Sequence, residues 1–157
     1  MADICCGAPL LEAGAREAFV QHARRVADDL GAYHHIVTGD AGCAYTLRVL
    51  YARLGVAAPR WERIEHVSEL AARNTHLLRA EAAPREVFVH DACRLGRGMG
   101  VYDAPRAVIA AVNGAPPKEL PRHHEHAGCS GAGGLLPVTH PETAQGIARE
   151  LAGEIGE

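Results

Sequence analysis

The sequence contains no long apolar run and no concentrated basic stretch. A membrane-spanning helix needs roughly 18 or more consecutive apolar residues, and no segment approaches that length. The first residues also lack the basic and apolar regions of a secretory signal, so we expect a cytoplasmic protein without a transmembrane segment. Binding to phosphate backbones calls for clustered Lys and Arg, whereas the formal net charge is −3, so we expect no nucleic-acid partner.

Aromatic residues are scarce, at 4% of the chain, but 48% of residues are hydrophobic and 22% are charged. This composition is that of a folded globular protein. The length of 157 residues suits one domain, or two small halves that share a core. Five cysteines, an odd number with two adjacent, indicate a reducing compartment and metal or redox chemistry rather than a disulfide framework.

Two cysteine-glycine clusters resemble copies of one element. Cys5-Cys6-Gly7-Ala8 lies near the start and Cys129-Ser130-Gly131-Ala132 near the end, and an apolar pair follows each. Ser130 then stands where the first copy has Cys6. Glycine beside thiols lets backbone amides approach the sulfurs, as a thiolate-ligated metal centre needs. Buried structural cysteines in a turn are the alternative.

Apolar periodicity and turn residues predict strands that alternate with helices. We expect helices over residues 10–30, 44–54, 67–78, 105–112 and 141–155, and strands over 33–38, 59–65, 86–90 and 118–120. This pattern predicts an α/β fold of two pseudo-repeated, Rossmann-like halves, each with a mainly parallel sheet and helices on both faces. We place the halves at residues 1–82 and 83–157.

Cys43 and Cys93 each follow a predicted strand. Loops at the carboxyl ends of parallel strands form the binding crevice of such folds, so ligands are expected there. Asp40-Ala41-Gly42-Cys43 has the spacing of a Cys-x-x-Cys pair with aspartate in the first position. Thirty-three residues separate Cys6 from Asp40, and 35 separate Cys93 from Cys129.

Further motifs follow in the sequence and extend the set over nearly the whole chain. They are His90-Asp91-Ala92-Cys93-Arg94-Leu95-Gly96-Arg97, Tyr102-Asp103-Ala104-Pro105-Arg106 and His140-Pro141-Glu142. In this order they resemble the cysteine-rich CCG-domain proteins. That family includes the B subunit of heterodisulfide reductase, iron–sulfur subunits of glycolate oxidase and lactate-utilisation enzymes, and the C subunit of anaerobic glycerol-3-phosphate dehydrogenase. The resemblance implies modules built from a single cysteine, a Cys-Cys-Gly loop and a Cys-x-x-Cys pair, with two modules around iron–sulfur centres.

The chain departs from that pattern in both halves. The first module lacks its front strand and first cysteine, and retains Cys5, Cys6 and Cys43 with Asp40, which could ligate iron or simply cap the following helix. The second lacks its terminal Cys-x-x-Cys and retains Cys93 and Cys129, too few for an ordinary four-cysteine cluster. We therefore expect one cluster, of the 4Fe-4S type, at the first set.

Histidines near Cys93 and Cys129 could supply further metal ligands. They are His90, His123, His124, His126 and His140. The His123-His124-Glu125-His126 run has no structural-zinc spacing, and solvent-facing side chains are the simpler interpretation. The glycines of residues 96–100 and 131–134 lack a nucleotide-binding fingerprint and are expected to approach the cluster instead. Arg94 and Arg97 could favour the thiolate form of Cys93 or contact an anionic partner; the alternative is that both lie exposed on a loop.

We therefore predict an electron-transfer subunit of a larger oxidoreductase rather than a stand-alone catalyst, with other oxidoreductase subunits or a redox protein as partner. The complementary gaps of the two modules also suggest a homodimer. The alternatives are a cluster-free interaction or assembly subunit that keeps the CCG fold, and a zinc-binding structural protein. His90-Asp91 beside Cys93 does not imply a catalytic triad, because neighbours on a strand point to opposite faces.

Overall fold

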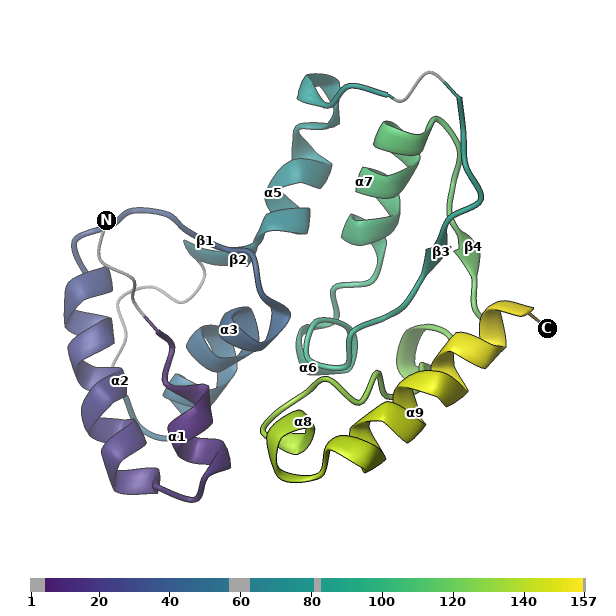
Figure 1. Ribbon diagram of the computed structural model, residues 1–157. Helices are drawn as coiled ribbons and strands as arrows, with labels where there is room; N and C mark the ends of the chain where they lie inside the picture. Colours follow the sequence, from purple (N-terminus) through teal and green to yellow (C-terminus); the bar gives the residue numbers. More distant parts are fainter. Residues whose placement is uncertain (1–4, 57–62, 81–82, 157) are drawn as a thin grey trace.

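The computed structural model describes residues 5–56, 63–80 and 83–156. The first half begins with α1 (Ala8–Glu12) and α2 (Arg16–Leu30), which form a helical hairpin (Figure 1). The sequence predicted one helix across both. Gly14, at φ 80°, ends α1: Gly14 N–H donates to Leu11 O and Ala15 N–H donates to Leu10 O. That pair of hydrogen bonds is a Schellman motif, which reverses the chain direction.

The next elements form a strand–helix–strand unit. They are β1 (Ile36–Thr38), α3 (Ala41–Tyr45), the π-helix η1 (Thr46–Leu50), α4 (Tyr51–Arg53) and β2 (Ile64–His66). Strands β1 and β2 pair in parallel, with Ile36 opposite Ile64 and Thr38 opposite His66. The helix predicted over 44–54 is therefore present, with a π-helical stretch inside it. Residues 59–62 of the predicted strand lie outside the described part of the chain.

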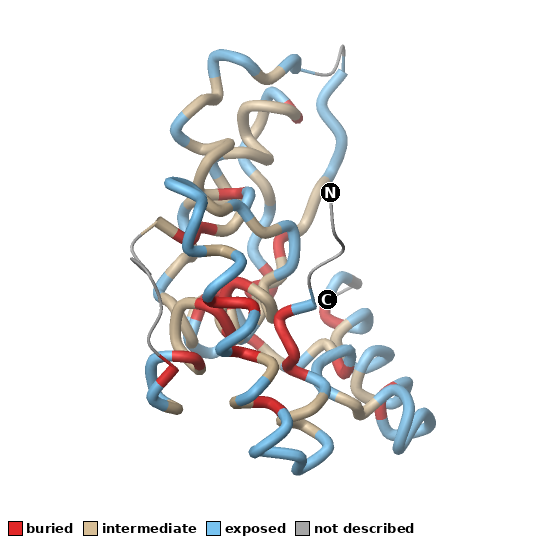
Figure 2. Tube along the Cα trace, turned by 90° about the vertical axis from the view of Figure 1, so that its left-hand side faces the viewer, coloured by how far each residue is buried: buried red, intermediate tan, exposed pale blue. Residues whose placement is uncertain are grey.

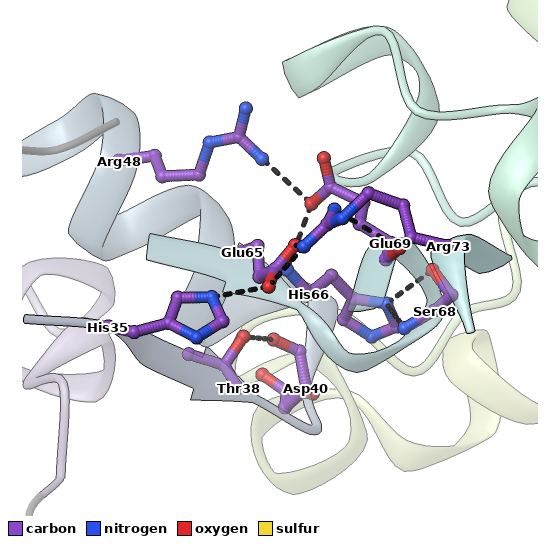
Figure 3. Close-up of polar contacts among 9 residues, drawn as sticks. All are labelled: His35, Thr38, Asp40, Arg48, Glu65, His66, Ser68, Glu69 and Arg73. Carbon is purple, nitrogen blue, oxygen red and sulfur yellow. Dashed lines mark hydrogen bonds and ion pairs between the residues drawn. The ribbon is translucent and has the colours of Figure 1, made fainter. Parts of the chain in front are cut away.

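Helix α5 (Val67–Arg73) follows β2 directly, and the 3-10 helix η3 (Thr75–Leu77) completes the predicted 67–78 segment. A polar network fixes this turn (Figure 3). The His66 ring accepts from Ser68 N–H, while Glu69 accepts from His66 N–H and from Arg48 of η1. This capping box, together with the Glu65 contacts to His35 and Arg73, locks β2 onto α5.

The second half contains another parallel strand pair, formed by β3 and β4. Its elements are β3 (Phe88–Val89), α6 (Gly96–Met99), α7 (Asp103–Asn113), β4 (Lys118–Glu119), η4 (His124–His126), α8 (Leu136–Thr139), α9 (Pro141–Gly153) and η5 (Glu154–Gly156). The sequence did not predict α6 or α8. Helices α5 and α7 lie side by side and join the halves (Figure 1). Within the described residues no helix has the length and apolar character to cross a membrane.

The α/β prediction is confirmed in its coarse form, as helices with short parallel strands. Each described sheet has two strands of two or three residues, so neither forms the extended sheet that a Rossmann-like half would have. Two Rossmann-like halves divided near residue 82 stay a prediction, and residue 82 lies outside the described part.

The main core lies in the first half (Figure 2). Phe19 of α2 and Tyr51 of α4 are fully buried and meet edge to face, with ring centroids 5.7 Å apart. Their apolar neighbours are Cys6, Ala8, Ala23, Val26, Ala27, Leu47, Val56 and Ile64. Cys6 belongs to this core, so the first cysteine loop is anchored by packing.

The second half relies on a buried ionic network. Asp91 follows β3, and its side chain is 3% exposed. Arg106 of α7 donates to both oxygens of Asp91 at 2.7 and 2.8 Å, and also to both oxygens of Glu119 on β4. Burial raises the pKa of Asp91, but hydrogen bonds from Arg106 and from His124 N–H outweigh it and leave that pKa below its ordinary value. The network therefore links both strands of this sheet to α7.

Replacing Asp91 with Asn should lower the free energy of unfolding by about 2–4 kcal/mol at neutral pH, because Arg106 loses a buried partner. The lowered pKa of Asp91 means that its stabilisation is complete above the unfolded-state pKa of about 3.9 and is lost as the pH falls below it. Urea unfolding at neutral and acidic pH should show a variant penalty that shrinks in acid. A penalty that is the same at both pH values would contradict this account.

Candidate metal centre

All five cysteines line one cavity of about 410 Å³. Four segments form its wall, contributing residues from 5–9, 40–43, 90–94 and 128–134, and Glu12 at the end of α1 completes it. Cys43 lies in the first turn of α3, which follows β1, and Cys93 lies in the turn after β3, so both follow strands as predicted. The sequence assigned the thiols to two separate sets, whereas the structure brings both sets to one place.

The two cysteine-glycine loops have the same local geometry. Gly7 and Gly131 have φ angles of 81° and 74°, which favour glycine strongly. Each turns its N–H toward the sulfur two residues earlier: Gly7 N–H donates to Cys5 Sγ at 3.4 Å, and Gly131 N–H donates to Cys129 Sγ at 3.3 Å. The predicted amide-to-sulfur arrangement is thus present in both loops. In the second loop, Ser130 Oγ also accepts from Ala132 N–H.

Space requires glycine at these positions as well. A methyl group on Gly7 would lie 2.6 Å from the His22 ring, and one on Gly131 would collide with the carbonyl oxygen of Ala144 in α9. Two side chains also hold the carbonyl oxygens of the first loop. His22 Nε2 lies 2.7 Å from Cys5 O, and Tyr51 O–H donates to Cys6 O at 2.9 Å. Both loops therefore sit tightly against a helix.

Asp40 is the N-cap of α3, since its Oδ1 accepts from Cys43 N–H at 2.7 Å. The capping role that the sequence allowed is therefore present. Cys43 Sγ lies 3.2 Å from Cys6 Sγ. Burial, the neighbouring Cys6 thiol and the Asp40 carboxylate raise the pKa of Cys43 to about 12. Two close thiols beside a carboxylate favour the protonated form unless a cation shares the cavity.

Arginines attach the Cys93 segment to the other loops. Arg94 pairs with Glu12 of α1, so it joins the two halves at the cavity wall. Arg97 donates to the carbonyl oxygens of Glu125 and Ala127 at 3.0 and 2.8 Å, just before Cys129. Neither arginine is an unpaired loop side chain. The sequence gave no signal for Glu12, whose partner lies 82 residues away.

Of the five histidines considered as ligands, one lines the cysteine cavity and four do not. His90 lines the cavity, and its Nε2 lies 3.1 Å from Gly128 O in the Cys129 loop. The other four do not line it. The glycines of 96–100 are also absent from its wall: Gly96 and Gly98 pack against the rings of Tyr102 and Tyr45. The expectation that those glycines approach a cluster is therefore wrong.

The spacing of the thiols does not place three sulfurs around a single point. A tetrahedral zinc ion with Zn–S distances of about 2.3 Å needs its sulfurs within about 4 Å of one another. In the described part of the chain, no three cysteine sulfurs all lie within 4.8 Å of one another. The thiols instead line one cavity, in which Cys6 Sγ and Cys43 Sγ lie 3.2 Å apart.

Comparison with known proteins places the chain in a family. The family model described as "Cysteine-rich domain" (CCG) matches residues 1–48 and 87–157. The chain belongs to the CCG cysteine-rich domain family. The two matched segments carry every cysteine of the cavity, and the unmatched residues between them include β2 and α5.

Curated relatives in this family include reductase subunits. The chain is 30% identical over 150 residues to the B subunit of fumarate reductase (CoM/CoB) from Methanothermobacter marburgensis, covering 96% of this chain and 29% of the relative. It is 30% identical over 154 residues to the D subunit of dihydromethanophenazine:CoB–CoM heterodisulfide reductase from Methanosarcina mazei, covering 92% and 37%.

Lactate utilization protein A of Bacillus licheniformis is 26% identical over 157 residues, covering 94% of this chain and 64% of the relative. The chain thus spans well under half of the two reductase subunits and slightly less than two thirds of the lactate utilization protein. No solved structure matches it.

Gly131→Ala tests the cysteine loop geometry, with Gly133→Ala as a matched control in the same loop. The first change forces a positive φ on alanine and a clash with Ala144 O, and should lower the free energy of unfolding by at least about 2 kcal/mol. A methyl group on Gly133 meets no atom within 4 Å, so its effect should stay within about 0.5 kcal/mol. Urea unfolding of both variants checks this, and equal midpoints would contradict the loop assignment.

Proposed function

We propose that this protein is an iron–sulfur-binding electron-transfer subunit of a larger oxidoreductase. The observation that carries the proposal is the convergence of Cys5, Cys6, Cys43, Cys93 and Cys129 on one cavity. Membership of the CCG family and the reductase subunits among its relatives support the same conclusion. A bound cluster would supply reversible one-electron storage.

The ligands of this centre would come from the five cavity thiols, with one cluster per chain. Gly7 and Gly131 would each donate an N–H to a ligating sulfur, which lowers the energy of the reduced, more negative state. Asp40 would cap α3 rather than bind the cluster, because its Oδ1 already accepts a hydrogen bond from Cys43 N–H. A cluster of the 4Fe-4S type ordinarily takes four cysteine thiolates, so the five thiols of the cavity are one more than it needs.

The two halves, residues 1–82 and 83–157, would act as two incomplete modules that together form one site. The first half contributes Cys5, Cys6 and Cys43, and the second contributes Cys93 and Cys129. The Arg94–Glu12 ion pair holds the two halves together. Because both sets already meet within one chain, the complementary gaps no longer call for a homodimer. The expected partners are therefore other oxidoreductase subunits or a redox protein.

An electron-transfer role also requires a centre near the surface. Cys5, Cys93 and Cys129 are exposed, Cys43 is half-buried and Cys6 is buried. The cavity therefore opens on the side of the exposed sulfurs, and Cys6 ties it to the core. A partner that docks over the exposed cysteines would come close enough for electron transfer without entering the fold.

Cys43→Ser and Cys129→Ser test whether the two sets form one centre. Iron and acid-labile sulfide per chain should fall severalfold and to a similar extent in both variants, because each removes a ligand from the same cluster. Ser130→Ala is the matched control: it lies in the same loop, lines the same cavity and removes no thiol, so its iron content should equal that of the parent protein.

The measurement is metal and sulfide analysis of anaerobically purified protein, together with its visible absorption spectrum. Loss in Cys43→Ser alone would restrict the centre to the first cysteine set. Zinc without sulfide in the parent protein would indicate a structural metal site instead. A folded parent protein without metal would point to a cluster-free assembly subunit that keeps the CCG fold.

A further inference from the structure

A second group of metal-binding side chains lies outside the cysteine cavity. Glu119 ends β4, His123 precedes η4, and His124 is its first residue. One ligand atom from each lies within 4.8 Å of the other two, the only such grouping of His, Cys, Asp and Glu in the described part of the chain. None of the three lines the cysteine cavity.

The two imidazoles direct their Nδ1 atoms toward each other. His123 Nδ1 lies 2.7 Å from His124 Nδ1, so only one of these nitrogens can carry a proton in the neutral pair. A tetrahedral metal ion that accepts both lone pairs would take the place of that proton, with the two nitrogens moving apart to about 3.3 Å. Without a proton or a cation between them, two lone pairs would face each other at this distance, which is unfavourable.

The backbone and a neighbouring ring hold His124 in this orientation. Its φ of 54° is the only positive value among the described non-glycine residues. His124 N–H donates to the buried Asp91 Oδ2 at 2.6 Å, and its ring packs against Tyr102 with centroids 5.1 Å apart. The ring is thus positioned before any ligand arrives.

The local charge favours a cation. Arg106 carries one positive charge but contacts two carboxylates, Asp91 and Glu119. Each Glu119 oxygen accepts one hydrogen bond from Arg106, which leaves a second lone pair for a metal.

An adjacent cavity of about 450 Å³ adds to this preference. Glu119 and His123 line it together with Glu154, whose side chain is 9% exposed. Glu154 Oε1 accepts from Arg122, whereas Oε2 is buried without a hydrogen-bond donor in the part of the chain that the structure describes. A buried carboxylate oxygen without a donor adds negative potential to this cavity.

We propose that Glu119, His123 and His124 form a second metal site, selective for a divalent transition-metal ion such as Zn²⁺. Two imidazoles and one carboxylate are ligands that zinc accepts readily. The bound ion would join the end of β4 to the loop that leads to Cys129. The site is chemically distinct from the cysteine cavity, because it has no sulfur ligand.

Titration of the full-length protein with Co²⁺, a spectroscopic substitute for Zn²⁺, tests the proposal. Cobalt bound by thiolates shows a sulfur-to-metal charge-transfer band, whereas cobalt held by imidazole and carboxylate shows d–d bands without it. The parent protein should bind one Co²⁺ of the second kind. His123→Gln and Glu119→Gln should weaken that binding by at least about tenfold.

His126→Gln is the matched control, because His126 is exposed in the same loop and lies outside the grouping. It should bind cobalt as the parent does. His123→Gln is the decisive variant, since His123 is exposed and, among the described residues, no hydrogen bond or ion pair joins it to Arg106; circular dichroism would confirm that it is folded. Equal cobalt affinity in His123→Gln and the parent protein, or a charge-transfer band for every bound cobalt, would overturn the proposal.

Discussion

The cysteine cavity depends on holding two halves of the chain face to face. Packing of α5 against α7 joins them on one side, and the Arg94–Glu12 ion pair joins them at the cavity wall. Both side chains of that pair are largely buried, at 29% and 20% exposed, so solvent screens the attraction less than at an open surface. Without these contacts, Cys5, Cys6 and Cys43 would not meet Cys93 and Cys129.

Local sequence signals were enough to locate each cysteine-glycine loop. Cys5-Cys6-Gly7 and Cys129-Ser130-Gly131 both adopt the positive φ and amide-to-sulfur hydrogen bond that their glycines suggested. The Asp40 cap of α3 also follows from its position before a helix. These features arise within a few residues, where backbone sterics and hydrogen bonding dominate.

Tertiary features could not be predicted in the same way. Residues that belong to separate sets in the sequence share one cavity because of contacts such as Arg94 with Glu12, and no local pattern encodes an 82-residue separation. The glycines at 96 and 98 looked like cluster-facing residues but make room for Tyr102 and Tyr45. The break between α1 and α2 was readable from Gly14, although the apolar periodicity continues through it.

The loop from residue 121 to 134 connects two sites of different chemistry. Arg97 holds its middle through the carbonyl oxygens of Glu125 and Ala127. One end carries imidazoles beside Glu119, and the other carries the Cys129 thiol. Thiolates prefer soft ions and iron–sulfur clusters, whereas imidazole with carboxylate suits harder divalent ions. With both proposed centres occupied, the two ends would therefore take metals of different type, and a fixed loop would let order at one end restrain the position of Cys129 at the other.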